Sequence, residues 1–476
     1  MNAQHYVDYN DEVVALYDHI INLNFDRSVL LLDSLLIDQP NNVALQHVAN
    51  YIDFFTIFIH EREKDFEERK KNIDKRIDVV DKLPNSDPYK RFIKSEIRLQ
   101  WALLRAKFNE IFKSSREIFT AYKTLEDNVK KHPDFIPNYK SLSIIHALAE
   151  SISIPGLFKD LFGIRGTIDL GVKEIEKVIE YKKSNPFIFG LESDAIYAFI
   201  LFYQCNRKQD AIEYLDSSPL ASSQSPLVTF VRVKLLQRNG DNDESILLLQ
   251  NLIKEQTVQK FPFLYFMMGN ALLRKLDPNA KFYLEKYVDH FEGQHYIKEA
   301  YQKLAWSSLI FENNIPEYKK YMELCVNEGN ALIDDDKQAL REASENIIPN
   351  QVLLKARLLY DGGYYQKASN LLVKQAHDFY FNEENSVEYF YRLGRVSQQL
   401  KNYSDAILYF DKTIQNDPKG KNYMTCNAAL QLGIIYENQN DPEKAKDYYE
   451  ECNKMSPNQY KASLHQKAKA GLSRIK

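Results

Sequence analysis

Glycine and proline are scarce in this chain, at 15 and 16 of 476 residues. A turn-rich all-β fold needs both residue types at its many tight turns, so their scarcity argues against such a fold. Tyrosine and phenylalanine are abundant instead, at 31 and 27 residues. Few turn residues and many large aromatic side chains are typical of long helices that pack through aromatic contacts. The sequence therefore predicts an all-α protein.

Long apolar runs are also missing. The longest, IDFFTIFI (52–59) and FPFLYFMMGNALL (261–273), are shorter than the roughly 20 residues that cross a bilayer, so we expect no transmembrane segment. The N-terminus MNAQHYVDYN has neither the basic nor the apolar region of a signal peptide, which favours a cytoplasmic protein. The alternative is a periplasmic or secreted protein in which Met1 replaces a removed signal peptide.

The chain has little net charge, at −4 with a pI of about 6.3. Without an overall basic field it has no general attraction for a phosphate backbone, so nucleic acid is not an expected partner. The four cysteines are widely spaced and contain no CxxC pair, and we expect them to be reduced structural thiols.

Motifs that carry catalysis or bind metal are missing as well. His60-Glu61 lacks the second histidine of an HExxH zinc site, and there is no GxSxG nucleophile motif. A catalytic triad assembled from distant positions stays open at this point. The sequence favours a protein that is not an enzyme and needs no cofactor and no metal.

The clearest pattern that is present lies in the C-terminal third. The segment 388–418 contains Leu-Gly, then Ala, then Phe, then Pro, and the segment 427–457 has equivalent residues at the same offsets. The paired positions are Leu393-Gly394 with Leu432-Gly433, Ala406 with Ala445, Phe410 with Tyr449, and Pro418 with Pro457.

This pattern resembles the tetratricopeptide repeat, an antiparallel helix pair of about 34 residues. The resemblance implies an α-solenoid of stacked antiparallel helix pairs, a TPR-like superhelix. Gly394 and Gly433 would let the two helices of a hairpin approach closely. Weaker copies lie upstream, and Ala211 and Ser245 are about one repeat of 34 residues apart. We therefore expect helix pairs from about residue 8 to the C-terminus.

The repeat pattern is clearer in some parts of the chain than in others, and on this basis we divide the chain into four predicted segments. Residues 1–152 are predicted to hold N-terminal helical repeats, and 153–190 a glycine-containing connection between repeats followed by a helix. Residues 191–345 are predicted to hold degenerate middle repeats, and 346–476 the C-terminal tetratricopeptide repeats with a capping helix.

The segment SIPGLFKDLFGIRGTIDLG (153–171) holds four of the 15 glycines. Its glycines match neither the Walker loop nor GxGxxG, so an irregular connection between helices is expected rather than a phosphate site. The segment also resembles the corresponding connection in the tetratricopeptide repeat protein 39 family. Within it, an apolar ridge is a candidate contact for a partner helix or a lipid surface; its residues are Leu157, Phe158, Leu161 and Phe162.

The tetratricopeptide resemblance implies a concave groove lined by the first helix of each repeat. The groove residues that it predicts are Arg357, Tyr360, Tyr391, Arg395, Gln398, Glu437 and Asn438. Tyr391 and Arg395 stand where chaperone-binding repeats carry Lys and Asn, so a chaperone-tail clamp is not expected. These side chains either bind a partner or simply cover the next repeat, and the sequence leaves both readings open.

The sequence thus predicts a non-enzymatic scaffold or adaptor that binds a protein partner, a peptide or a helix, in this groove. The alternative is a peripheral membrane or lipid-associated adaptor that uses the apolar ridge.

Overall fold

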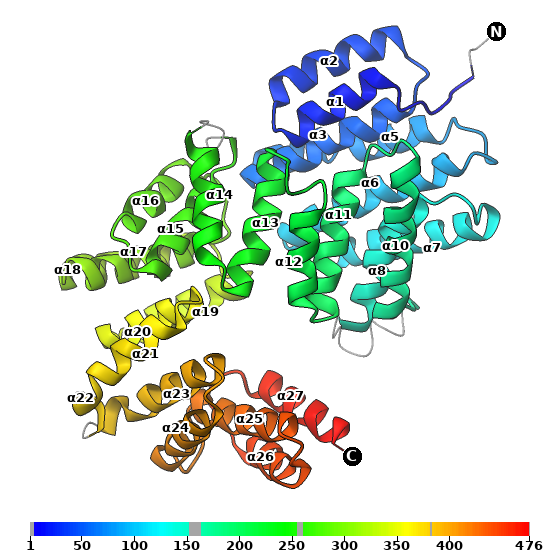
Figure 1. Cartoon of the computed structure of the whole chain (residues 1–476). Helices are drawn as coiled ribbons and strands as arrows, with labels where there is room; N and C mark the ends of the chain where they lie inside the picture. Colours follow the sequence, from blue (N-terminus) through cyan, green and yellow to red (C-terminus); the bar gives the residue numbers. More distant parts are fainter. Residues whose placement is uncertain (1–3, 152–162, 255–259, 381–382, 476) are drawn as a thin grey trace.

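The structure is a computed structural model that describes residues 4–151, 163–254, 260–380 and 383–475. Within these ranges the chain is helical and forms no strand; a single isolated bridge joins Tyr6 to Asn42. The predicted all-α fold is confirmed. Figure 1 shows helix pairs stacked along a curved path, which runs from the N-terminal half through α14–α18 to the C-terminal helices.

The N-terminal half consists of helices that pack mostly as antiparallel neighbours. They are α1 (Asp11–Ile21), α2 (Phe25–Asp38), α3 (Ala44–His60), α4 (Glu63–Arg69), α5 (Asn72–Val80), α6 (Pro88–Lys107), α7 (Ile111–Lys131), α8 (Asn138–Ser151), α10 (Ile168–Ser184), α11 (Gly190–Phe199) continued by the π-helix η1 (Ile200–Gln204), α12 (Lys208–Ser217) and α13 (Pro226–Asn239).

The remaining helices continue the same plan to the C-terminus. They are α14 (Asn242–Lys254), α15 (Phe263–Lys275), α16 (Ala280–His290), α17 (Ile297–Phe311), α18 (Ile315–Asn327), α19 (Asp334–Ser344), α20 (Gln351–Asp361), α21 (Tyr365–Lys374), α22 (Ala376–Tyr380), α23 (Glu383–Gln399), α24 (Tyr403–Asn416), α25 (Tyr423–Asn438), α26 (Pro442–Lys454) and α27 (Lys461–Arg474).

The two C-terminal repeats pack as their glycines predict. A β-carbon on Gly394 in α23 would lie 2.6 Å from the Phe410 ring in α24, and one on Gly433 in α25 would lie 2.5 Å from the Tyr449 ring in α26. Only glycine leaves room for these rings. The paired helices of each repeat are thus held together by the aromatic residue that occupies the same position in both repeats.

The cysteines are all free, and two of them meet in the last repeat. Cys426 and Cys452 are fully buried between α25 and α26, with their Sγ atoms 3.5 Å apart. Sequence spacing did not suggest this pairing, which follows from the antiparallel packing of the two helices.

The N-terminal half curls until its ends meet. The Ser225 hydroxyl, at the start of α13, donates to the Ile21 carbonyl at the end of α1 over 2.5 Å. Beyond this closure, the Glu61 carboxylate binds His295 at 2.8 Å and Lys107 at 2.6 Å. Helices α1–α3 therefore contact residues more than 200 positions later, and α1–α13 form a closed turn (Figure 1).

Glycines of the segment 153–171 serve helix packing where the structure describes them. A β-carbon on Gly166 would lie 2.5 Å from Cα of His146, and one on Gly171 would lie 2.5 Å from the Ser143 carbonyl oxygen. The start of α10 can therefore lie directly against α8. The apolar ridge Leu157, Phe158, Leu161 and Phe162 falls outside the described residues, and the division of the chain at 152, 190 and 345 stays a prediction.

Candidate functional site

The predicted groove residues of the C-terminal repeats come together around one arginine. Arg395 in α23 donates to the Tyr391 hydroxyl at 3.0 Å and to the Tyr360 hydroxyl of α20 at 2.6 Å. Its guanidinium also lies 5.1 Å from the centre of the Tyr360 ring, a cation–π contact. Three of the predicted groove residues therefore form one cluster that joins α20 to α23.

The same cluster continues to the next repeat. The hydroxyl of Tyr391, a buried side chain, accepts from Asn427 of α25 at 2.6 Å. Gln398 donates to Gln431 at 3.0 Å, and Gln431 donates to Asn427 at 3.1 Å. Much of the hydrogen-bonding capacity of the predicted groove is thus used between the first helices of successive repeats, as expected for residues that cover the next repeat.

Arg357 of α20 makes a separate set of contacts. Its guanidinium lies over the Trp306 ring at 4.8 Å and pairs with Glu342 of α19 at 3.1 Å. Helix α19 in turn reaches the C-terminal end of the chain, where the Tyr460 hydroxyl donates to Gln338 at 2.9 Å. The C-terminal repeats therefore curl back onto α19.

Glu437 and Asn438 lie apart from the arginine cluster. The Glu437 carboxylate accepts from Arg474 of α27 at 2.7 and 2.8 Å and from the Tyr449 hydroxyl. Asn438 is exposed at the end of α25. The structure thus joins Tyr360, Tyr391, Arg395 and Gln398 in one hydrogen-bonded cluster, whereas Arg357 pairs with α19 and Glu437 fastens the terminal helix.

We expect Tyr391→Phe to lower the free energy of unfolding by about 1–3 kcal/mol, because Arg395 and Asn427 both lose a buried acceptor. Tyr403→Phe is the matched control, since Tyr403 is 40% exposed, and its effect should stay within about 0.5 kcal/mol. Urea unfolding of the full chain measures both. Equal effects would mean that the Tyr391 hydroxyl does not hold the repeats together.

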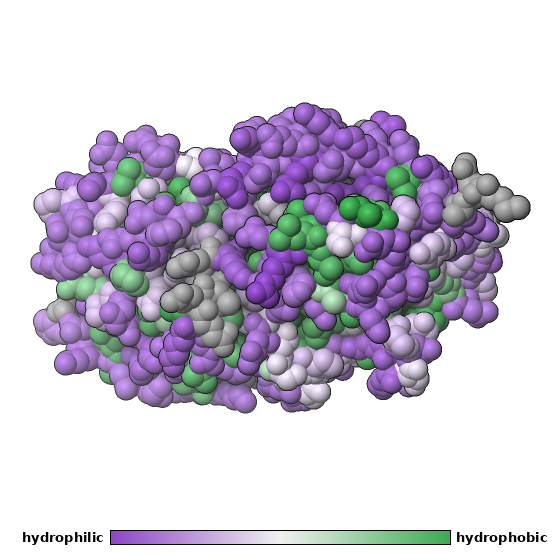
Figure 2. All heavy atoms as spheres, turned by 90° about the horizontal axis from the view of Figure 1, so that it is seen from above, coloured by the Kyte–Doolittle hydropathy of each residue, from purple (hydrophilic) through white to green (hydrophobic). Residues whose placement is uncertain are grey.

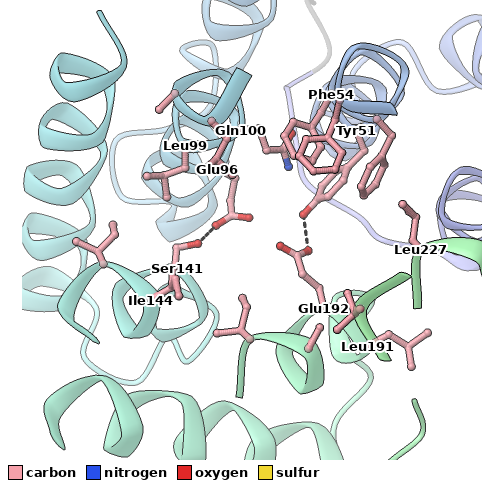
Figure 3. Close-up of a pocket in the computed structure, with 18 of the residues that line it drawn as sticks. Tyr51, Phe54, Glu96, Leu99, Gln100, Ser141, Ile144, Leu191, Glu192 and Leu227 are labelled. Atoms are coloured by element: carbon pink, nitrogen blue, oxygen red, sulfur yellow. Dashed lines mark hydrogen bonds between the residues drawn. The ribbon is translucent and has the colours of Figure 1, made fainter. Parts of the chain in front are cut away.

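A second concave site lies inside the closed turn of α1–α13. It is a cavity of about 520 Å³, lined by residues of α1, α3, α6, α7, α8, α11 and α13 (Figure 3). Most of the lining is apolar and half-buried, including Phe54, Leu99, Ile144, Leu191 and Leu227. Ile164, which ends the LFKDLFGI stretch, also lines this cavity. Sequence reasoning missed this site.

One end of the cavity is polar and built around a buried lysine. The ammonium group of Lys140 in α8 pairs with Glu96 of α6 at 2.5 Å and with Glu192 of α11 at 2.7 Å. The Tyr51 hydroxyl of α3 donates to Glu192 at 2.7 Å, and the Ser141 hydroxyl donates to Glu96 (Figure 3). Four helices of the turn are thus joined at one point.

Burial and pairing act against each other on these charges. Burial raises the pKa of Glu96, and the nearby Lys140 ammonium only partly offsets that rise. Burial would lower the pKa of Lys140, but the carboxylates of Glu192 and Glu96 outweigh it and raise that pKa. Lys140 therefore stays charged, and it is the main group that lowers the pKa of Glu96.

The outer surface gives a contrasting picture. Figure 2 shows a mostly hydrophilic face with a larger apolar area on the N-terminal half, where α2 lies in Figure 1. Helix α2 exposes Leu30 and Ile37, at 71% and 79%.

Among the described residues, no three His, Cys, Asp or Glu side chains are placed to hold a metal ion. No helix within those residues is long and apolar enough to cross a membrane.

Comparison with solved structures finds helical repeat proteins of low sequence identity. Yeast Tom70 is 12% identical with a TM-score of 0.36, and the match covers 97% of this chain and 88% of Tom70. The TPR domain of P58(IPK) is 13% identical with a TM-score of 0.23, over 95% of this chain and 99% of that one.

Comparison of sequences finds matches that are shorter and closer. A stretch of 71 residues is 34% identical to the photosystem I assembly protein Ycf3 of Acaryochloris marina; it is 14% of this chain and spans 40% of the length of that relative. The family model of the tetratricopeptide repeat matches residues 387–419 and 427–459, which hold the two glycine–aromatic contacts between α23 and α24 and between α25 and α26. The chain therefore contains two tetratricopeptide repeats, which lie in α23–α26.

Proposed function

We propose that this protein is a non-enzymatic scaffold that binds an apolar segment of a partner protein in the cavity enclosed by α1–α13. Tetratricopeptide repeats generally serve as protein-interaction scaffolds, and repeat solenoids bind their partners on the concave face. The observation that carries the proposal is the cavity itself: an apolar space of about 520 Å³ on the inner face of the closed turn.

The cavity has the size and chemistry of a binding site. Ligand sites measure about 300–1,000 Å³ and combine an apolar lining with a few polar groups that set orientation. Here the apolar lining is half-buried, so a bound segment would remove it from water at a gain of about 25 cal/mol per Å² of apolar surface. The polar lining includes the hydrogen-bonded Tyr51, Glu96, Ser141 and Glu192, which would set the orientation of a bound segment.

The predicted C-terminal groove is the second candidate surface for a peptide or helix of a partner. One observation favours it: the Nε atom of Arg395 is buried and has no hydrogen-bond partner within the described part of the chain. A partner carbonyl could accept from it. The groove ranks second because Tyr391, Gln398 and the rest of the Arg395 side chain already bind neighbouring repeats.

Two cavity variants test the proposal by opposite means. Ala195→Trp fills the cavity with an apolar ring, and Phe54→Asp places a charge in its wall; both side chains line the cavity and are half-buried. We expect each to weaken capture of a specific partner by about tenfold or more, equivalent to about 1.4 kcal/mol. Affinity capture from cells followed by quantitative mass spectrometry measures the loss.

The double variant Tyr391→Ala/Arg395→Ala is the comparison, because it changes the C-terminal groove and leaves the cavity unchanged. Circular dichroism melting of each variant shows that the fold is retained. Partners lost from the groove variant but kept by Ala195→Trp would move the binding surface to the C-terminal repeats. Flotation of the wild-type chain with liposomes, without a captured protein, would favour the lipid-associated adaptor instead.

A further inference from the structure

We infer that the partner segment inserts a Lys or Arg side chain, flanked by apolar residues, against Glu192 at the polar end of the cavity. This inference rests on the proposed function and specifies the chemistry of the bound segment. It is carried by the charge of the polar end, by the access to Glu192, and by an unpaired donor beside it.

The charge at the polar end is unbalanced. Glu96 and Glu192 supply two carboxylates, and Lys140 supplies one ammonium group between them. The neighbouring His47 adds no positive charge, because burial, helped by the nearby Lys140, holds its pKa well below the usual value. The cluster therefore holds two acidic groups against one ammonium group, and a cation from the partner would supply a second positive charge.

Glu96 and Glu192 both line the cavity, and Glu192 is the more exposed of the two. The side chain of Glu192 is 32% exposed, whereas Glu96 and Lys140 are 3% and 1% exposed. One Glu192 oxygen accepts from Lys140 and the other from Tyr51, and a carboxylate oxygen can accept more than one hydrogen bond. Glu192 can thus bind an incoming cation without giving up either partner (Figure 3).

Gln100 favours a peptide over a simple alkyl amine as the molecule bound in the cavity. Its Oε1 atom accepts from Asn50 at 2.6 Å, while its buried Nε2 atom finds no hydrogen-bond partner among the described residues. Gln100 lines the same cavity as Glu192, and the two are drawn together in Figure 3. A buried donor without a partner is costly, and a backbone carbonyl of the bound segment would satisfy it. An alkyl amine brings a cation but no such acceptor.

Matched small probes test the charge preference first. Octylammonium, octanol and octanoate share one apolar tail and differ in head-group charge, and calorimetric titration into the full chain compares them below their micelle concentrations. We expect octylammonium to bind at least about tenfold more tightly than octanoate, and Glu192→Gln to remove most of that preference. Glu437→Gln is the control, because it changes a carboxylate in the C-terminal repeats; it should leave the preference unchanged.

A random peptide library displayed on phage tests the peptide itself. Selection on the full chain should enrich short apolar peptides with one Lys or Arg, and selection on Glu192→Gln should lose that enrichment. Gln100→Leu should weaken the selected peptides by several-fold and leave octylammonium binding unchanged, because only the peptide offers a carbonyl.

The outcomes separate this inference from the proposed function. Equal binding of octylammonium and octanoate, or selected peptides without a basic residue, overturns the inference while the cavity stands as a binding site. Binding of octylammonium without any enriched peptide contradicts the claim that the ligand is a peptide, and it identifies a long-chain amine as the ligand. No binding by any probe or peptide overturns both the inference and the cavity as the binding surface.

Discussion

Replacing Lys140 with methionine should lower the free energy of unfolding by about 3–5 kcal/mol, the cost of leaving buried charge without its partner. Lys140 is 1% exposed and bridges Glu96 and Glu192, so its loss leaves Glu96 without its counter-ion in an almost fully buried site. Methionine keeps most of the apolar stem, which limits the loss of packing. Chemical unfolding of the full chain measures the change.

The loss should depend on pH in a defined direction. Burial already raises the pKa of Glu96, and removing Lys140 takes away the main group that lowers it. A carboxyl whose folded pKa lies above its unfolded value binds a proton on folding, so its stability is lost as pH rises. The deficit of Lys140→Met should therefore be larger at about pH 8 than at about pH 5.

Two further variants isolate the charge effect. Lys140→Met/Glu96→Gln should recover much of the loss, because no fully buried charge then remains unpaired. Lys183→Met is the exposed control: Lys183 is 62% exposed and pairs with Glu180 on the same helix, so its replacement should cost less than about 1 kcal/mol. A deficit that is the same at both pH values and survives the double change would show lost packing rather than lost charge.

Gly433→Ala should destabilise the protein by about 1–3 kcal/mol, although alanine is the better helix former. The new β-carbon would lie 2.5 Å from the Tyr449 ring. That ring is fully buried, its other side contacts Gly471 of α27, and its hydroxyl binds Glu437, so it has little freedom to move away.

Gly190→Ala is the matched control. Gly190 also lies in a helix, but the nearest atom to a β-carbon there is Cδ of the Lys182 side chain, at an ordinary 3.6 Å. Alanine at 190 should therefore leave stability unchanged or raise it by up to about 1 kcal/mol. Thermal and urea unfolding of the two variants compare them directly. If the two changes have the same effect, the Gly433–Tyr449 contact does not govern the packing of the last repeat.

The prediction of the C-terminal hairpins succeeded because it depends on contacts within one repeat. Gly394 and Phe410 are 16 positions apart, and their meeting requires only two helices and a short turn. The predicted groove residues were partly brought together for the same reason, since Tyr391 and Arg395 are one helical turn apart. Whether such side chains face a partner or a neighbouring repeat depends on how repeats stack, and one sequence did not resolve this.

The sequence alone therefore determined the helical class, the hairpin as the unit, and the small residues at which paired helices touch, because helix periodicity and steric fit are local. The cavity and its charged end were decided only by the tertiary structure. Their residues come from seven helices between Tyr17 and Val231, and they meet because successive hairpins turn until α13 reaches α1. In the sequence, Lys140 is one basic residue on a helix; the closed turn places it between two carboxylates from other helices and removes it from water.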